Sequence, residues 1–173
     1  GLVGSEMCIR DRVSTDEVYG DREGLPPCAE DAPLKPSSPY AASKAAADLL
    51  CMAYARTHDM SVLTVRSSNN YGPFQFPEKL IPLMLFNALM GKELPLYGDG
   101  LQQRDWLFVE DNVQAIFRVL VQGRTGKIYN IGADETLTNR AMVQTICRIL
   151  AEETERDLDK FLNQIRFVAD RPG

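Results

Sequence analysis

Histidine is almost absent from this chain, which has only His58 among its 173 residues. One histidine excludes metal sites built from several imidazoles and argues against a Ser-His-Asp triad. Paired cysteines are missing too, since no CxxC pattern occurs among the four cysteines, Cys8, Cys28, Cys51 and Cys147. We therefore expect a reduced, cytoplasmic protein without a disulfide framework and without a metal in its site.

Excess positive charge and long apolar runs are also lacking. The 19 Lys and Arg residues are outnumbered by 24 Asp and Glu residues, which leaves a net charge of −5, so we expect no nucleic-acid partner. The best apolar run, residues 80–90, is interrupted by Pro82 and Asn87 and is shorter than a bilayer requires, so we expect no membrane partner. The composition, 45% hydrophobic and 25% charged, is that of one ordinary globular domain or a piece of a larger one.

The first twelve residues, GLVGSEMCIRDR, form an unusual start. They lack an initiator Met and the long apolar core of a signal peptide, and they resemble a string that arises when sequencing adapter is translated as protein. We expect residues 1–12 to be non-native and to contribute nothing to the fold; the alternative is a native strand that leads into Val13. The chain ends in RPG without a helix stop or a polar tail, so we expect truncation at both ends.

Local patterns predict strands that alternate with helices. Pro39, preceded by the potential cap Ser38, opens an alanine-rich helix to about Arg56, and the β-branched run VLTVR at 62–66 predicts a strand. Residues 24–39 hold five of the ten prolines and predict an irregular loop. Further helices are predicted at 80–90, 111–121 and 138–153, and further strands at 94–97, 106–109 and 127–131. This alternation is typical of an α/β fold with a largely parallel sheet.

Tyr40 and Lys44 stand four residues apart in the alanine-rich helix, so the phenol and the ammonium lie on one face. A tyrosine that acts as a base near neutrality needs its pKa lowered by about three units, and a neighbouring cation favours the phenolate. A YxxxK pattern is weak by itself, because surface pairs also produce it. Tyr40 and Lys44 are therefore a candidate catalytic pair, with an exposed and unimportant pair as the alternative.

Asp16 and Glu17 lie in the segment STDEVYG, just after Val13. Carboxylates at the carboxyl end of a strand lie where open α/β sheets bind ligands, provided that the strand ends there and the turn brings both side chains to one cleft. Two carboxyls in different environments can serve separately as an acid and a base. A solvated acidic turn is the alternative.

Two further polar clusters could bind a ligand. Asn69 and Asn70 follow the strand VLTVR and could hold a polar group, although Asn-Asn-Tyr-Gly also suits a turn. Arg104 could bind a phosphate with two hydrogen bonds. The alternative for Arg104 is a structural ion pair with Asp105 or Asp111.

Six segments occur together in a fixed order: STDEVYG, SPYAASKAAAD, RSSNNYGPFQFPEKLIPL, YGDGLQQRDWLFVEDN, YNIGA and RPG. This series resembles the extended short-chain dehydrogenase/reductases of the NAD-dependent epimerase/dehydratase family over residues 13–173. The resemblance implies an α/β fold, with the C-terminal part of a Rossmann-type doubly wound sheet plus most of a small nucleotide-sugar-binding domain. It also implies a partial domain, because the family's glycine-rich turn, which cradles the pyrophosphate, and its continuation beyond RPG do not occur here.

The resemblance further implies dehydration of a nucleoside-diphosphate hexose, dTDP-glucose in particular, to its 4-keto-6-deoxy product, with NAD as a recycled cofactor. Tyr40 would take the proton of the 4-hydroxyl, and Lys44 would hold the nicotinamide ribose. Thr15 would hydrogen-bond the 4-hydroxyl, Asp16 would protonate the departing 6-hydroxyl, and Glu17 would remove the carbon-5 proton. The resemblance also places a cofactor contact at Asn70 and nucleotide-sugar contacts at Asn69, Lys79, Leu80, Pro95, Tyr97, Arg104, Asn139 and Arg171.

Four related functions stay open: a nucleotide-sugar epimerase, a UDP-glucuronate decarboxylase, a dehydratase for another nucleotide and a non-catalytic nucleotide-sugar-binding homologue. The carboxylates of Asp16 and Glu17 argue against the epimerase, which has no elimination step. The intact set of Thr15, Asp16, Glu17, Tyr40 and Lys44 argues against the non-catalytic homologue. We expect the isolated chain to be inactive, because the pyrophosphate-binding turn is missing.

Related enzymes build a dimer interface from the helix that carries the tyrosine and the lysine. Here that helix offers an apolar stripe made of Ala45, Leu49, Met52 and Ala53. We therefore expect the full-length protein to be a homodimer. The alternative is that the stripe covers the sheet of its own subunit.

Overall fold

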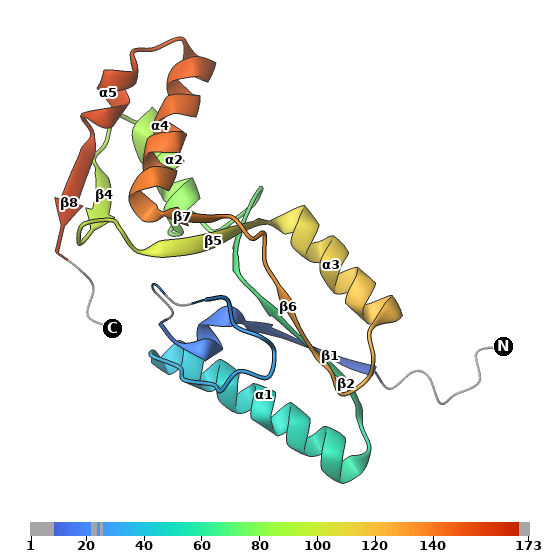
Figure 1. The fold of residues 1–173 in the computed structure, drawn as a ribbon. Helices are drawn as coiled ribbons and strands as arrows, with labels where there is room; N and C mark the ends of the chain where they lie inside the picture. The colour runs from blue at the N-terminus through green and yellow to red at the C-terminus, as the bar shows by residue number, and fades with distance from the viewer. Residues whose placement is uncertain (1–8, 22–23, 25, 170–173) are drawn as a thin grey trace. The chain divides into compact units, whose positions relative to one another are not determined.

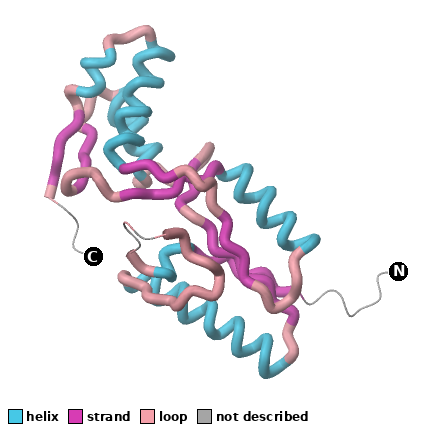
Figure 2. Tube along the Cα trace, viewed as in Figure 1, coloured by secondary structure: helices cyan, strands magenta, loops and turns pink. Residues whose placement is uncertain are grey.

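The structure, a computed structural model, describes residues 9–21, 24 and 26–169. The chain divides into two compact units (Figure 1). The first unit contains the chain up to Asn70 together with residues 107–133, and the second contains residues 71–106 together with the chain from Asp134 onward. Each unit mixes helices and strands (Figure 2), so the α/β prediction is confirmed.

The first unit is built on a parallel sheet of three strands, in the order β1-β2-β6. They are β1 (Ile9–Thr15), β2 (Ser61–Ser67) and β6 (Ile128–Ile131). Thr15 is level with Ser67, and Ser67 is level with Ile131. The carboxyl ends of all three strands therefore lie along one edge, which is where parallel sheets bind ligands.

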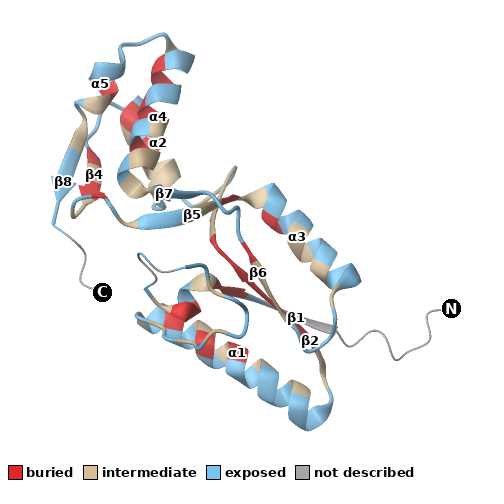
Figure 3. Cartoon of the chain, viewed as in Figure 1, coloured by how far each residue is buried: buried red, intermediate tan, exposed pale blue. Residues whose placement is uncertain are grey.

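The two faces of this sheet are covered by different helices, α1 (Pro39–His58) and α3 (Val109–Gln122) (Figure 1). Successive side chains of a strand point to opposite faces. In β2, Val65 packs in a cluster with residues of α3, whereas its neighbour Arg66 bonds to Asp48 of α1. The central strand is buried almost throughout because both of its faces are covered (Figure 3).

The structure corrects the expectation for residues 1–12 in part. Ile9 to Arg12 belong to β1 and lie opposite Ser61 to Thr64 of β2, so the expectation that the whole segment contributes nothing to the fold is wrong for these four residues. Residues 1–8 lie outside the described part. That residues 1–12 are non-native stays a prediction.

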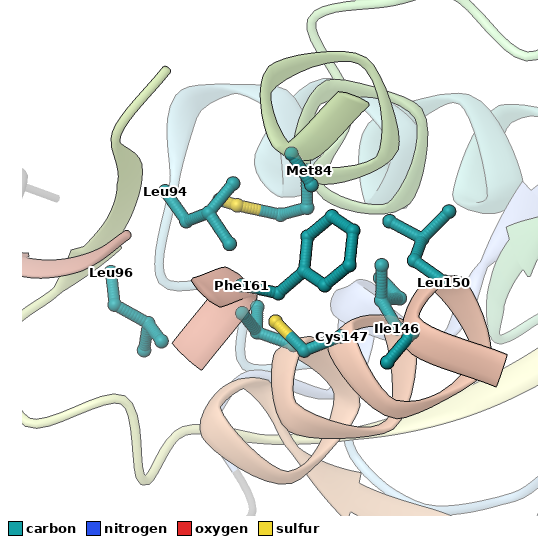
Figure 4. Packing of buried hydrophobic residues seen from close by; sticks show 10 residues of the cluster. Met84, Leu94, Leu96, Ile146, Cys147, Leu150 and Phe161 are labelled. Carbon is teal, nitrogen blue, oxygen red and sulfur yellow. The ribbon is translucent and has the colours of Figure 1, made fainter. Parts of the chain in front are cut away.

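The second unit has a core between its helices and a parallel pair of strands (Figure 4). Phe161 of α5 (Leu158–Leu162), which is 2% exposed, lies among side chains of α2 (Leu80–Leu89) and α4 (Asn139–Thr154). Strands β4 (Leu94–Tyr97) and β8 (Ile165–Val168) contribute Leu94, Leu96 and Ile165 to this core. The unit therefore has its own hydrophobic core.

Most predicted elements are present, with shifted ends. Thr138 caps α4, because its hydroxyl oxygen accepts from the backbone N–H of Ala141 at 3.1 Å. The strand predicted at 106–109 is β5 (Gln103–Phe108), which begins three residues earlier and pairs with β7 (Thr136–Thr138). Five short elements of the described residues were not predicted: the 3-10 helix η1 (Asp16–Tyr19), β3 (Asn69–Tyr71), β7, α5 and β8.

Candidate active site

The segment after β1 turns immediately into the short helix η1, and Thr15 makes that turn. Its side-chain oxygen accepts from the backbone N–H of Glu17 at 3.3 Å, and its hydroxyl donates to a carboxylate oxygen of Asp16, also at 3.3 Å. Thr15 is buried, Asp16 is half-buried and Glu17 is exposed. The strand does end where the sequence analysis required, and two carboxylates follow it in different environments.

After η1, Gly20 brings the chain into contact with the proline-rich loop of residues 24–39. Gly20 has φ +79°, and a Cβ there would collide with the carbonyl of Lys35. The backbone N–H of Lys35 donates to the carbonyl of Val18 at 3.0 Å. Glycine is therefore required at position 20 both for its backbone conformation and for the close approach of the loop.

Tyr40 and Lys44 lie in the first two turns of α1, which begins at Pro39 with Ser38 as its cap. The Ser38 hydroxyl oxygen accepts from the backbone N–H of Ala41 at 3.1 Å. Tyr40 is 55% exposed. The ammonium of Lys44 donates to the carbonyl of Val13, in β1, at 2.8 Å. Lys44 thus ties the helix to the strand that carries Thr15.

The electrostatics of Tyr40 connect it with the two carboxylates. Partial burial raises the pKa of the Tyr40 phenol, the charges of Glu17 and Asp16 raise it further, and Arg12 opposes them. The charges of both carboxylates therefore act on the pKa of the Tyr40 phenol. The pKa of Tyr40 is thus raised above its ordinary value, chiefly by partial burial and then by the negative charges near the phenol.

The pKa of Lys44 moves in the opposite direction, below its ordinary value. Burial is the main cause, the Arg12 cation adds to it, and Asp48 partly offsets both. An ammonium has three donors, and Val13 engages one of them. Lys44 and the exposed Tyr40 therefore both offer polar groups near the end of β1, where parallel sheets bind ligands.

Sequence reasoning missed a buried polar network beneath this site. Asp48, which is fully buried, accepts from Arg66 at 3.0 Å and from Ser14 at 2.9 Å. Arg66 is 2% exposed and also donates to the hydroxyl of Tyr19 at 2.8 Å. Two signals in the sequence could have identified the network: Asp48 follows Lys44 by four residues, and Arg66 is a charged residue in a β-branched strand.

Asn69 and Asn70 lie just beyond the end of β2, half-buried in β3. The amide of Asn70 donates to the carbonyl of Ser68 at 3.0 Å, so part of the Asn70 side chain serves the turn. Beside them, the buried Ser67 donates to Asn112 of α3 at 2.8 Å. The structure thus brings Thr15, Asp16 and Glu17, Tyr40 and Lys44, and Asn69 and Asn70 into one unit, on the elements at its carboxyl edge.

The remaining predicted contacts belong to the second unit. Lys79 precedes α2 and forms an exposed ion pair with Glu78 at 3.5 Å, while Leu80 begins the helix and packs against the core. Pro95 and Tyr97 lie half-buried in β4.

Two more of these predicted contacts lie near the loop after β4. Arg104 is exposed in β5, where its guanidinium donates to the carbonyl of Gln103 at 3.0 Å. Asn139 begins α4, and its side chain donates to that of Gln102 at 3.4 Å. The predicted contact at Arg171 lies outside the described residues.

The described residues show neither a metal-binding cluster nor a membrane-spanning helix. Within residues 9–169, apart from 22, 23 and 25, there is no group of three or more His, Cys, Asp or Glu side chains placed to hold a metal ion. No helix in the same part of the chain combines the length and the apolar character needed to cross a membrane.

Comparison with known families and proteins gives consistent matches. A model described as "NAD dependent epimerase/dehydratase family" matches residues 12–132. The dTDP-glucose 4,6-dehydratase of Neisseria gonorrhoeae is 53% identical over 165 residues, which cover 93% of this chain and 48% of that protein. This chain thus spans about half the length of the curated relatives it matches.

Solved structures also match nearly all of this chain and about half of their own length. A dTDP-glucose 4,6-dehydratase from Bacillus anthracis, in complex with NAD, is 48% identical with a TM-score of 0.85, covering 94% of this chain and 50% of that one. A UDP-glucuronic acid 4-epimerase from Bacillus cereus, in complex with UDP-glucuronic acid and NAD, is 25% identical with a TM-score of 0.82, covering 95% and 50%. The dehydratase is much more similar in sequence, while the fold is shared by both.

Proposed function

Because the chain belongs to the NAD dependent epimerase/dehydratase family, we propose that it carries the catalytic residues of a nucleoside-diphosphate hexose 4,6-dehydratase acting on dTDP-glucose. The observation that carries this proposal is geometric: Asp16 and Glu17 follow the end of β1, and the helix that begins with Tyr40 is joined to β1 by the bond from Lys44 to Val13. A dehydration of this kind needs a base for an O–H proton, a base for a C–H proton and an acid for a leaving hydroxyl. Tyr40, Glu17 and Asp16 supply one group for each need.

The proposed cofactor is NAD, and its chemistry is the acceptance of a hydride from the hexose and its return later in the turnover. Tyr40 and Lys44 would hold its ribose, and Asn70 would make a further contact. The positions of these three residues support the assignment, since all lie on elements at the carboxyl edge of the parallel sheet.

Each proton of the proposed reaction has a residue of this chain assigned to it. Tyr40 takes the proton of the 4-hydroxyl as the carbon–oxygen double bond forms, while Thr15 holds that oxygen by a hydrogen bond. The new ketone acidifies the proton on carbon 5, and Glu17 removes it. Asp16 gives a proton to the 6-hydroxyl, which leaves as water. The 4-keto-6-deoxy product would then be completed by return of the hydride to carbon 6 and of the proton held by Glu17 to carbon 5.

The different environments of Asp16 and Glu17 support this division of roles. Asp16 is half-buried and accepts a hydrogen bond from Thr15, whereas Glu17 is exposed and bonded through its backbone. An epimerase needs no elimination, so it would have no use for a second carboxylate. A decarboxylase or a dehydratase for another nucleotide would differ in substrate contacts, which we assign to Asn69, Lys79, Leu80, Pro95, Tyr97, Arg104, Asn139 and Arg171.

A chimeric protein tests the proposal. Residues 13–173 would replace the matching part of the Neisseria gonorrhoeae dehydratase, and the product of dTDP-glucose would be analysed by mass spectrometry and NMR. We expect a 4-keto-6-deoxy hexose that has lost one water, and no turnover by the chimera with Tyr40→Phe. We expect no turnover by the 173-residue chain alone, because it has no glycine-rich pyrophosphate turn.

Two outcomes of this experiment would contradict the dehydratase assignment. The first is that dTDP-glucose stays unchanged although the chimera binds NAD and keeps the circular dichroism spectrum of the relative. That result would contradict the proposed dehydratase activity. A hexose inverted at carbon 4 with no loss of water would favour the epimerase instead.

A further inference from the structure

The buried network around Asp48 holds the segment of Asp16 and Glu17 at both of its ends. On the side of β1, one carboxylate oxygen of Asp48 accepts from the hydroxyl of Ser14 at 2.9 Å. On the other side, Arg66 donates to the hydroxyl of Tyr19 at 2.8 Å. Ser14 and Tyr19 flank the segment, and they bond to the two members of the ion pair between Asp48 and Arg66. Asp48 also forms an ion pair with Arg12 at 3.2 Å.

The same ion pair also holds the helix that carries Tyr40. Asp48 lies on α1, four residues after Lys44 and eight after Tyr40, so all three project from neighbouring positions of one face. Lys44 reaches Val13 at 2.8 Å and Asp48 reaches Ser14 at 2.9 Å. Two successive residues of β1 are therefore bonded to two successive turns of one face of α1.

The Tyr19 side of the network extends to a third element. The Tyr19 hydroxyl donates to the side-chain carbonyl of Asn130 in β6 at 2.8 Å, and the Asn130 amide donates to the carbonyl of Cys28 at 2.9 Å. The guanidinium of Arg66 lies 4.9 Å from the centre of the Tyr19 ring. Tyr19 is 5% exposed, so its position is determined by these partners rather than by solvent.

A buried ion pair is a poor source of net stability, because removing two charges from water costs about as much as their attraction returns. Its directional bonds do restrict geometry. We propose that the Asp48–Arg66 ion pair is a positioning pair, which sets the separation between the Glu17 carboxylate and the Tyr40 phenol. The inference rests on the proposed function in one respect, because it takes Glu17 and Tyr40 as two groups that act on the same substrate.

The test measures the electrostatic coupling of Glu17 with Tyr40 in the 173-residue chain. The charged groups that act on the Tyr40 phenol are Glu17, Asp16 and Arg12. Because the Glu17 charge raises the pKa of Tyr40, Glu17→Gln should lower it. The pKa is followed by NMR of ¹³C-labelled tyrosine, with the Tyr40 signal identified by its loss in Tyr40→Phe.

The same Glu17→Gln shift is then measured in two variants that remove hydrogen bonds and no charge. Ser14→Ala removes the bond on the β1 side, and Tyr19→Phe removes the two bonds of the Tyr19 hydroxyl, with Arg66 and with Asn130. We expect each variant to reduce the shift by about half or more, because a Coulomb interaction weakens as charges separate and water enters. Ser37→Ala and Tyr54→Phe, matched changes at residues outside the network, should leave the shift as it is in the wild type.

A merely structural role of the ion pair would lower the melting temperature and leave the coupling in the folded state unchanged. An unchanged Glu17→Gln shift in both Ser14→Ala and Tyr19→Phe, with the wild-type circular dichroism spectrum, therefore overturns the proposal. Asp48→Asn is the stronger variant and should abolish the shift if the chain stays folded. The readout is a proton affinity and not turnover, so a failure of the proposed reaction leaves this test valid.

Discussion

At the scale of single residues, the shift in the pKa of Tyr40 is opposite to the one that its proposed role requires. Its proposed role as a base requires a lowered pKa, but partial burial and the charges of Glu17 and Asp16 raise it. Lys44, the cation expected to lower it, donates instead to the carbonyl of Val13. A positively charged nicotinamide ring would favour the phenolate, so part of the required shift is assigned to the proposed cofactor.

Arg12 offers a direct check of this description. Its cation lowers the pKa of both Tyr40 and Lys44, so Arg12→Ala should raise both. For Tyr40 the change removes a charge that stabilises the phenolate, and for Lys44 it removes a charge that repels the ammonium. NMR titration of labelled tyrosine and lysine in the 173-residue chain measures both values. Arg56→Ala, at an exposed position near the other end of α1, is the control, and equal values in wild type and Arg12→Ala would contradict the prediction.

The proposed roles of Tyr40 and Glu17 separate in time. In the chimera, Tyr40→Phe should stop the reaction before any reduced nicotinamide appears. Glu17→Gln keeps the size of the side chain but removes the base for the carbon-5 proton, so reduced nicotinamide should form and persist in single-turnover absorbance. A positioned base contributes about 10²–10⁴ in rate. If Glu17→Gln keeps the full rate, or if both variants stop before reduction, the assignment of Thr15, Asp16 and Glu17 is wrong.

At the scale of elements, β1 forms a strand although the first half of its sequence does not favour one. Its first half, IRDR, has two arginines and an aspartate, which is not the β-branched pattern of a buried strand. It pairs along its whole length with β2, and Arg12 forms an ion pair with Asp48 at 3.2 Å. Backbone pairing with a well-formed neighbour accounts for the strand.

Truncation tests the contribution of these residues. A chain that begins at Val13 loses the pairing of Ile9 to Arg12 with β2, whereas a chain that begins at Ile9 keeps it. We expect the shorter chain to be less stable by about 2 kcal/mol or more, since each backbone hydrogen bond contributes about 1 kcal/mol, which corresponds to about 5 °C in melting temperature. Calorimetry of the two chains measures the difference. Equal melting temperatures would restore the expectation that residues up to Arg12 contribute nothing.

At the scale of the whole molecule, the outer side of α1 bears on oligomeric state. Ala45 is 5% exposed and packs with Val18 and Tyr19, so it does not belong to a free stripe. Leu49 and Met52 are 55% and 48% exposed, and Ala53 is exposed as well. These three do not cover the sheet of their own unit, which removes the alternative explanation for them.

The homodimer stays a prediction, and sedimentation of the chimera tests it. We expect a dimer at micromolar concentration and a shift toward monomer in Leu49→Lys, because a charge in an apolar interface is costly to bury. Arg118→Lys on α3, which keeps an exposed charge, is the control. A monomeric wild-type chimera would reject the dimer.

The elements that could be predicted from the sequence depend on neighbours in the chain. The cap Ser38, the proline at position 39 and the alanines after it predict α1, and VLTVR predicts β2, because capping and β-branching act within a few residues. The order of motifs identified the family and named Tyr40, Lys44, Asp16 and Glu17. That order is a property of the chain itself, and it required no contact to be known.

Only the tertiary structure decided what joins these residues. Asp48 meets Ser14 across 34 positions of sequence and Arg66 across 18, and Tyr19 meets Asn130 across 111. No local pattern encodes such pairs, because a buried charge is stable only when the fold brings its partner to it. The same holds for Lys44, whose neighbour in the helix is Tyr40 but whose ammonium bonds to Val13 in β1. Local sequence determined which groups are proposed to react, and long-range packing determined which residues hold them in place.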